Sequence, residues 1–232
     1  MAPLSEHRYL VLLAALLLIV VTQPLVAHES VAASLAFDLL VAAAAVGVVF
    51  IVFSLRWERR VAVLLAAPAI VLTVARYALP GGATAHYAVA YHLSAALFLG
   101  YAVAVMVRNI LRGGTFSFDA VLGAFAGYLL LGVAWGSLYA AVEQIAPGAF
   151  SVSPEIRWQL EDWHLRRALF SYVSFSTMAS LGYSDVTAVT PLANTLTWLE
   201  VMAAQFYLAV VIAQIVGLKL AQAMRASRHN GG

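Results

Sequence analysis

The sequence predicts an all-α polytopic membrane protein with six transmembrane helices and one shorter re-entrant helix. Hydrophobic residues make up 63% of the 232-residue chain, and charged residues make up 10%. Soluble domains carry about 45–50% apolar and about 25% charged residues, so this chain needs a bilayer as its solvent. The second observation is that six apolar segments are long enough to cross a hydrocarbon core of about 30 Å, which takes about 20 helical residues.

The six expected spans follow one another with short polar connections. They are Tyr9–Ala27, Val31–Leu55, Val61–Leu79, Ala88–Val107, Ala120–Val142 and Leu192–Leu220. A further apolar segment, about Leu165–Ala179, is too short to cross and return, so we expect a re-entrant half-helix there. The first span follows Arg8 as a secretory signal would, but its apolar core exceeds about 7–15 residues, and we expect it to be retained.

The balance of basic residues predicts that both termini face the cytoplasm, in a plasma (inner) membrane. Nine Lys and Arg residues belong to the connections on one side: Arg8, Arg56, Arg59, Arg60, Arg108, Arg112, Lys219, Arg225 and Arg228. The opposite connections hold four: Arg76, Arg157, Arg166 and Arg167. The long outward loop, at about 143–191, also carries five acidic residues: Glu143, Glu155, Glu161, Asp162 and Asp185. These predict an outer vestibule that concentrates cations.

A flexible break at Gly113-Gly114 divides the expected spans into two blocks. Residues 1–112 form a block of four spans, residues 113–222 a block of two spans with the re-entrant helix, and residues 223–232 a short cytoplasmic tail. The first block lies where a voltage sensor would lie. A sensor needs repeated arginines in its fourth span, because each charge that crosses about 100 mV supplies about 2.3 kcal/mol. Ala88–Val107 contains no arginine, so we expect no classical voltage gating.

The informative stretch is Phe170–Asp185, which reads FSYVSFSTMASLGYSD. A short apolar helix ends there in small hydroxyl residues, and no acid–base pair, nucleophile or metal-ligand cluster accompanies it, so an enzyme is not expected. Non-helical backbone is tolerated at membrane depth only where it is buried in protein or lines water. Its carbonyl groups then replace the hydration shell of a cation. Gly182 permits the positive φ that turns successive carbonyls the same way.

On these residues, the chain resembles the pore module of the potassium channel family, whose filter reads T-V-G-Y-G-D, often with Leu in place of Val. The matching positions are Ser180, Leu181, Gly182, Tyr183, Ser184 and Asp185. The resemblance covers roughly residues 120–220. It continues through Pro191-Leu192 into a segment similar to the inner helix of bacterial six-span channels, with Gln205–Ala209, Ile212-Ala213 and Val216-Gly217.

The resemblance implies a homotetramer in the lipid bilayer that conducts monovalent cations passively. Four copies of the backbone carbonyls of Ser180, Leu181, Gly182 and Tyr183 would bind dehydrated potassium ions. The resemblance assigns support of the filter to three further residues: Thr177, Asp185 and Glu200. It implies no cofactor besides the permeant ion, and the net charge of +2 is too small to indicate a nucleic-acid partner.

Three positions depart from the family pattern. Ser180 replaces threonine and keeps a hydroxyl for the innermost ion site. Ser184 replaces the second filter glycine, where a left-handed conformation costs about 1–2 kcal/mol, so we expect relaxed potassium selectivity. Ala204 stands where a hinge glycine is usual, which makes bending of the inner helix stiffer or displaces it to Gly217.

Polar residues inside the spans leave alternatives open. Glu200, about two turns into the last span, either bonds to the re-entrant helix behind the filter, faces the aqueous cavity, or is a carboxyl kept neutral by burial. Asp38 and His92 could pair across helices. With Glu200 they suggest a second function, a secondary transporter or proton-coupled carrier, although such folds have paired broken helices and one re-entrant element is found. Arg76 is expected to snorkel.

Two further patterns concern packing. Four glycines on the fifth span are spaced for close helix contact, and packing against the inner helix is the expected use: Gly123, Gly127, Gly132 and Gly136. Trp158 and Trp163 are expected in the outer aromatic belt.

Overall fold

The computed structural model describes residues 8–26, 31–78, 85–113, 116–182 and 185–230, and these are helical almost throughout. The longer helices are α1 (Arg8–Thr22), α2 (Val31–Val52), α3 (Arg56–Ala78), α4 (Ala85–Arg112), α5 (Phe118–Ile145), α6 (Trp163–Met178) and α7 (Pro191–Asn230). The shorter elements are the 3-10 helices η1 (Gln23–Leu25) and η2 (Arg157–Leu160) and the strands β1 (Phe150–Val152) and β2 (Val186–Ala188).

Five of the described helices are long and apolar enough to cross a membrane: α2, α3, α4, α5 and α7. The protein is therefore a polytopic, membrane-embedded α-helical protein. The first expected span corresponds to α1 and η1, whose apolar segment Tyr9–Leu25 is shorter than these five. Pro24 interrupts this segment, because proline has no backbone N–H to continue an α-helical ladder, and the chain passes into a 3-10 turn.

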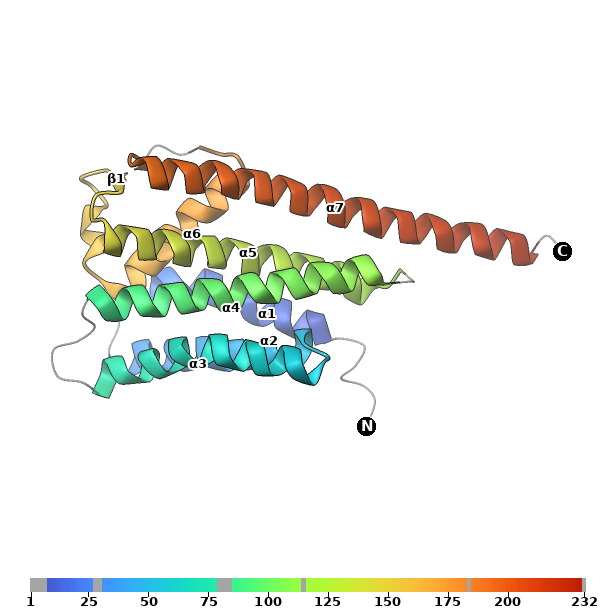
Figure 1. The fold of residues 1–232 in the computed structure, drawn as a ribbon, viewed down its shortest axis with the longest axis horizontal. Helices are drawn as coiled ribbons and strands as arrows, with labels where there is room; N and C mark the ends of the chain where they lie inside the picture. Colours follow the sequence, from blue (N-terminus) through green and yellow to red (C-terminus); the bar gives the residue numbers. More distant parts are fainter. Residues whose placement is uncertain (1–7, 27–30, 79–84, 114–115, 183–184, 231–232) are drawn as a thin grey trace.

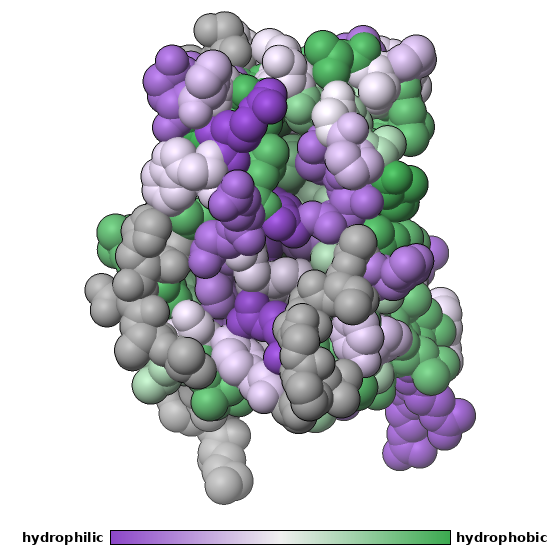
Figure 2. All heavy atoms as spheres, turned by 90° about the vertical axis from the view of Figure 1, so that its left-hand side faces the viewer, coloured by the Kyte–Doolittle hydropathy of each residue, from purple (hydrophilic) through white to green (hydrophobic). Residues whose placement is uncertain are grey.

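The last helix is longer than the sequence predicts. It extends beyond the expected end at Leu220 and continues to Asn230, so residues 223–230, expected as a tail, continue this helix. Figure 1 shows that α1 begins and α7 ends at the same end of the bundle, with α7 running along one side. Figure 2 looks onto the opposite end, which carries β1 and the start of α6, and shows hydrophilic residues gathered there.

The central helix of the bundle is α5, which contacts α1, α4, α6 and α7. One buried apolar cluster joins it to α1, α2, α4 and α7 through Leu12, Val52, Met106, Leu130 and Tyr207. A second cluster lies nearer the polar end and joins α5, β1, α6, β2 and α7 through Tyr139, Phe150, Phe170, Val186 and Ala193. The helix α6 thus packs against α5, the long helix before it, and α7, the long helix after it.

The pairing of β1 with β2 corrects the all-α prediction in one place. The two strands are antiparallel, with Phe150 opposite Ala188 and Val152 opposite Val186. Each strand has three residues, too few for alternation of polar and apolar residues to predict it. This pair ties the connection after α5 to the chain that follows residue 185.

The four glycines of α5 named above allow close contact with three different helices. Gly127 faces Tyr207 of α7, as expected, but Gly123 faces Tyr9 of α1. Gly132 and Gly136 face α6, so the expectation of packing against the inner helix is wrong for three of the four. The closest approach to backbone is at Gly136, where an added Cβ would lie 2.9 Å from the Phe170 carbonyl oxygen and 3.0 Å from Ser171 N.

We predict that Gly136→Ala lowers the free energy of unfolding by about 1–3 kcal/mol, because the added methyl group meets backbone of α6, which cannot rotate away. Gly100→Ala on α4 is the matched control, since a Cβ there meets nothing within 4 Å. The control should be neutral or stabilising by up to about 1 kcal/mol, the helix preference of alanine over glycine. Denaturant unfolding in detergent micelles measures both, and equal effects would contradict the close α5–α6 contact.

Candidate functional site

The C-terminal end of α6 turns the chain out of the helix at Ser180. Leu181 N donates to the Ser176 carbonyl and Ser180 N donates to the Thr177 carbonyl, both at 2.9 Å. These are the two hydrogen bonds of a Schellman motif, in which the residue after the helix takes a left-handed conformation. Ser180 has this conformation, with φ of 57°. Thr177, predicted to support the filter, contacts this turn through its carbonyl group.

The segment Ser180–Gly182 alternates in backbone conformation. Gly182 is also left-handed, with φ of 63°, while Leu181 between them is not. For Ser180 this conformation costs about 1–2 kcal/mol, since its Cβ approaches the following carbonyl oxygen. Two of the three residues from 180 to 182 therefore depart from both helical and extended backbone. Tyr183 and Ser184, the other two predicted filter residues, lie outside the described residues.

The chain is anchored again immediately after this segment. The Asp185 carbonyl accepts from Ser153 N at 2.9 Å, and the β1–β2 pairing begins at the next residue, Val186. Asp185, predicted as filter support, therefore contributes a backbone contact, and its side chain is exposed. The described chain is thus fixed by the end of α6 before residue 183 and by a strand pair from residue 185 on.

Behind this segment, Glu200 of α7 is fully buried. Tyr139 of α5 donates its hydroxyl hydrogen to one carboxyl oxygen, and Ser174 of α6 contacts the other. Ser174 Oγ also lies 2.8 Å from the Gly132 carbonyl oxygen of α5. Of the alternatives for Glu200, the contact with Ser174 agrees with a bond to α6, the helix predicted to be re-entrant. Three helices meet at this one carboxyl group, because each isolated polar group would be costly in an apolar interior.

The candidate hinge positions differ in their surroundings. Ala204 is fully buried, one turn after Glu200. A Cβ added at Gly217 would meet nothing within 4 Å. Packing therefore restrains α7 at Ala204 and leaves it unrestrained by neighbours at Gly217.

A second polar cluster joins the four-helix block to α6. Asp38 of α2 accepts from Arg76 at 2.6 Å and from Tyr77 at 2.8 Å, both on α3, and forms an ion pair with Arg167 of α6 at 3.3 Å. Arg76 also lies 3.3 Å from Nε2 of His164, and burial lowers the pKa of His164 to about 4, so its neutral ring serves as an acceptor. The prediction that Arg76 snorkels is therefore wrong.

The possible contact between Asp38 and His92 is not found in the part of the chain that the structure describes. Asp38 pairs there with Arg76, Tyr77 and Arg167. His92 instead stacks on Trp163, with ring centroids 5.4 Å apart. The guanidinium carbon of Arg76 lies 5.0 Å from the centroid of the Trp163 ring. Trp163 thus belongs to this cluster, while Trp158 is 47% exposed at the polar end. The three residues of the carrier hypothesis are not brought into one site, since Glu200 has its own partners.

The loop offers fewer free carboxylates to cations than the sequence predicts, because two of its five carboxylates accept hydrogen bonds from backbone N–H groups. Glu143 is buried and accepts from Gly148 N and Phe150 N. Asp162 is the N-cap of α6 and accepts from His164 N and Leu165 N. Glu155, Glu161 and Asp185 remain exposed.

Within the described ranges, no three His, Asp or Glu side chains gather as a metal-ligand set. The fold and site define a polytopic helical membrane protein in which a short helix and a non-helical segment lie between two long apolar helices. Neither a family model, nor a curated protein, nor a solved structure matches this chain. The resemblance to the potassium channel family therefore remains a prediction from the residues quoted above.

Sequence reasoning missed the partners that complete these clusters. Tyr139 and Ser174 lie on apolar segments where a lone hydroxyl gives no signal of a distant acceptor. Arg167 was assigned to an outer loop by counting charges, although its position in the first turns of a predicted half-helix would have placed it beside the spans.

We predict that Glu200→Ala lowers the free energy of unfolding by about 1–3 kcal/mol, because the Tyr139 hydroxyl loses its buried acceptor, whereas Ser174 keeps the Gly132 carbonyl. Glu200→Gln should cost less, since its amide retains one acceptor and adds a donor. Glu161→Ala, at an exposed position, is the matched control and should be neutral. Unfolding titrations in micelles measure the three variants, and equal stability of Glu200→Ala and the control would refute the buried network.

Proposed function

We propose that the protein is a homotetrameric cation channel that conducts potassium passively and is not classically voltage-gated. The observation that carries the proposal is the alternation of left-handed residues at Ser180 and Gly182 in a non-helical segment that follows a short helix. Backbone of this kind offers carbonyl oxygens as ligands for a dehydrated cation. The order of short helix, non-helical segment and long apolar helix agrees with the predicted pore module.

The electrostatics of α6 support a cation at this place. The C-terminal end of a helix carries a partial negative charge of about half an elementary charge, and α6 ends where the segment begins. The exposed carboxylates of Glu155, Glu161 and Asp185 add negative charge near the polar end of the bundle. The hydroxyl of Ser180 supplies one further oxygen at the inner end of the proposed filter.

The tetramer follows from the geometry of a carbonyl ring. One chain supplies one side of a filter, and a ring that replaces a hydration shell needs several copies. In a single chain the segment is uncovered, with Leu181 57% exposed. The apolar face of α7 is uncovered too, at Phe206 (64%) and Ile212 (56%), and lies along one side of the bundle (Figure 1). In the proposed assembly these surfaces face other copies or lipid.

The four-helix block is proposed to support the pore without sensing voltage. Arg108, at the cytoplasmic end of α4, pairs with the buried Glu58 of α3, and no other arginine precedes it on that helix within the predicted span. The ion pairs of Asp38 connect the block to α6, and through α6 to the proposed filter.

We predict that purified protein in liposomes passes potassium or thallium down a gradient without a co-substrate, and that Gly182→Ala abolishes this flux. A Cβ at position 182 meets nothing within 4 Å, so the substitution acts through the backbone, whose φ of 63° alanine adopts at a cost of about 1–2 kcal/mol. Gly148→Ala is the matched control, because Gly148 also has a positive φ, 87°, and an open Cβ position, but lies in the loop after α5.

The control should retain flux, and both variants should assemble like the unmodified protein on size-exclusion chromatography. Unchanged flux in Gly182→Ala would refute the filter assignment. Flux that requires a proton or counter-ion gradient would instead favour the carrier.

A separate prediction concerns Ser184. Replacement with glycine should raise the permeability ratio of potassium to sodium, because glycine takes the left-handed conformation that the family filter has at this position without steric cost. Reversal potentials under bi-ionic conditions measure the ratio. An unchanged ratio would show that serine does not relax the filter.

A further inference from the structure

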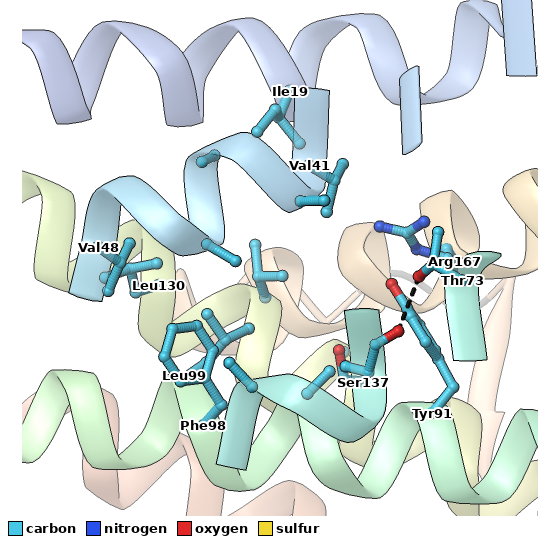
Figure 3. A pocket seen from close by; sticks show the side chains of 18 of the residues that line it. Ile19, Val41, Val48, Thr73, Tyr91, Phe98, Leu99, Leu130, Ser137 and Arg167 are labelled. Carbon is cyan, nitrogen blue, oxygen red and sulfur yellow. Dashed lines mark hydrogen bonds between the residues drawn. The ribbon is translucent and has the colours of Figure 1, made fainter. Parts of the chain in front are cut away.

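A cavity lies inside the bundle, away from the proposed filter. Its volume is about 100 Å³, and α1, α2, α3, α4, α5 and α6 all contribute to its wall. Figure 3 shows that the wall is divided by chemistry: Val48, Phe98, Leu99 and Leu130 gather on one side, and Tyr91, Ser137 and Arg167 on another. The cavity is thus amphipathic along its length, and its polar part is formed by α4, α5 and α6.

The polar part has an excess of positive charge. Two arginines, Arg76 and Arg167, share the single carboxylate of Asp38. Arg166, further along the start of α6, interacts with the carboxylates of Asp162 and Glu143, so Asp38 is the one carboxylate that pairs with both Arg76 and Arg167. Arg167 is the member of this group that lines the cavity. A buried charge is stable when it is paired, so an anion in the cavity would complete the cluster.

A second observation at the same place is an unpartnered polar atom. His92 lines the cavity and is only 1% exposed, and its Nδ1 atom has no hydrogen-bond partner among the described residues. A buried polar group without a partner costs about 1–3 kcal/mol. A ligand with a hydrogen-bonding head group beside His92 and Arg167 would remove that cost.

The apolar part continues toward the outside of the bundle. A second hollow of about 240 Å³, lined entirely by apolar residues, lies between α2 and α3. The two hollows share Ala66 and Ile70 as lining residues. Small side chains on α2, such as Ala45, keep the path open on the cavity side. The two hollows are therefore adjacent, and an alkyl chain that passes Ala66 and Ile70 would reach the apolar groove between α2 and α3.

We propose that this cavity binds the carboxylate of a long-chain fatty acid, with its alkyl chain along the groove between α2 and α3. The carboxylate supplies the missing negative charge beside Arg167 and an acceptor for its guanidinium, which has five donors. A doubly protonated His92 is not required, since the neutral tautomer with a hydrogen on Nδ1 donates to the carboxylate. Water alone leaves the apolar wall uncovered, and a diacyl phospholipid brings two chains to a route that admits one.

The bound head group would contact α6 at Arg167 and Ser171, both of which line the cavity. The site stands apart from the proposed permeation path, and its test does not depend on conduction.

The test uses full-length protein in micelles and palmitic acid that carries a photoactivatable diazirine on its chain. We expect cross-links on α2 or α3, mapped by mass spectrometry, and displacement of the label by unmodified palmitic acid. Ala45→Leu fills the cavity and should reduce labelling at least tenfold. Ala43→Leu, on the same helix at an exposed position outside the cavity wall, is the matched control and should label like the unmodified protein.

The head group is tested independently of any change in packing. Palmitic acid should compete at least tenfold better than its methyl ester, and Arg167→Gln should remove this difference; Asp38 keeps Arg76 and Tyr77 as partners in that variant. Equal competition by acid and ester on the unmodified protein would overturn the proposal, as would unchanged labelling of a folded Ala45→Leu. Competition by phosphatidylglycerol as strong as that by palmitic acid would also overturn it, in favour of a diacyl lipid.

Discussion

A carboxyl group without water must find its partners inside the protein, and this constraint organises the C-terminal half of the chain. Glu200 on α7 is fully buried, and a hydroxyl from α5 and another from α6 meet its two oxygens. Removing such a group leaves its partners unpaired, whereas keeping it fixes how three helices lie. Because Ser174 is one turn from the end of α6, the position of this carboxyl group also determines where the chain leaves that helix.

The non-helical segment is held by backbone contacts on either side of it. The Schellman hydrogen bonds end α6 with Ser180 in a left-handed conformation, and the β1–β2 pair receives the chain at Val186. The outer part of α6 is held separately, by the ion pair of Arg167 with Asp38 of α2. The four-helix block therefore contacts the start of α6 through Asp38 and Arg167. Near its end, α6 contacts α5 and α7 through Ser174. A change in one cluster would reach the other along a single rigid helix.

Hydropathy and length predicted the long helices well, because a helix that spans a bilayer needs about 20 predominantly apolar residues in a row, which the sequence shows directly. They failed at Pro24, where a local break shortened the first segment, and at β1 and β2, whose pairing depends on contact between distant residues. The filter was predicted from residue types and remains a prediction; Gly182 has the positive φ that its residue type permits, whereas the left-handed conformation of Ser180 was not predicted. The partners of Asp38 and Glu200 were not predictable, since Arg167, Tyr139 and Ser174 are brought to them by packing rather than by spacing.

The central claim is that the main chain around Gly182, repeated by several copies, replaces the water around a monovalent cation. The most direct measurement is a structure of the assembled protein with thallium in place of potassium, using the anomalous scattering of thallium to locate the ions. The account predicts peaks on a four-fold axis, level with the carbonyl oxygens of residues 180–182. A segment that lies away from any symmetry axis, or carbonyl groups turned away from an axis without ions, would contradict it.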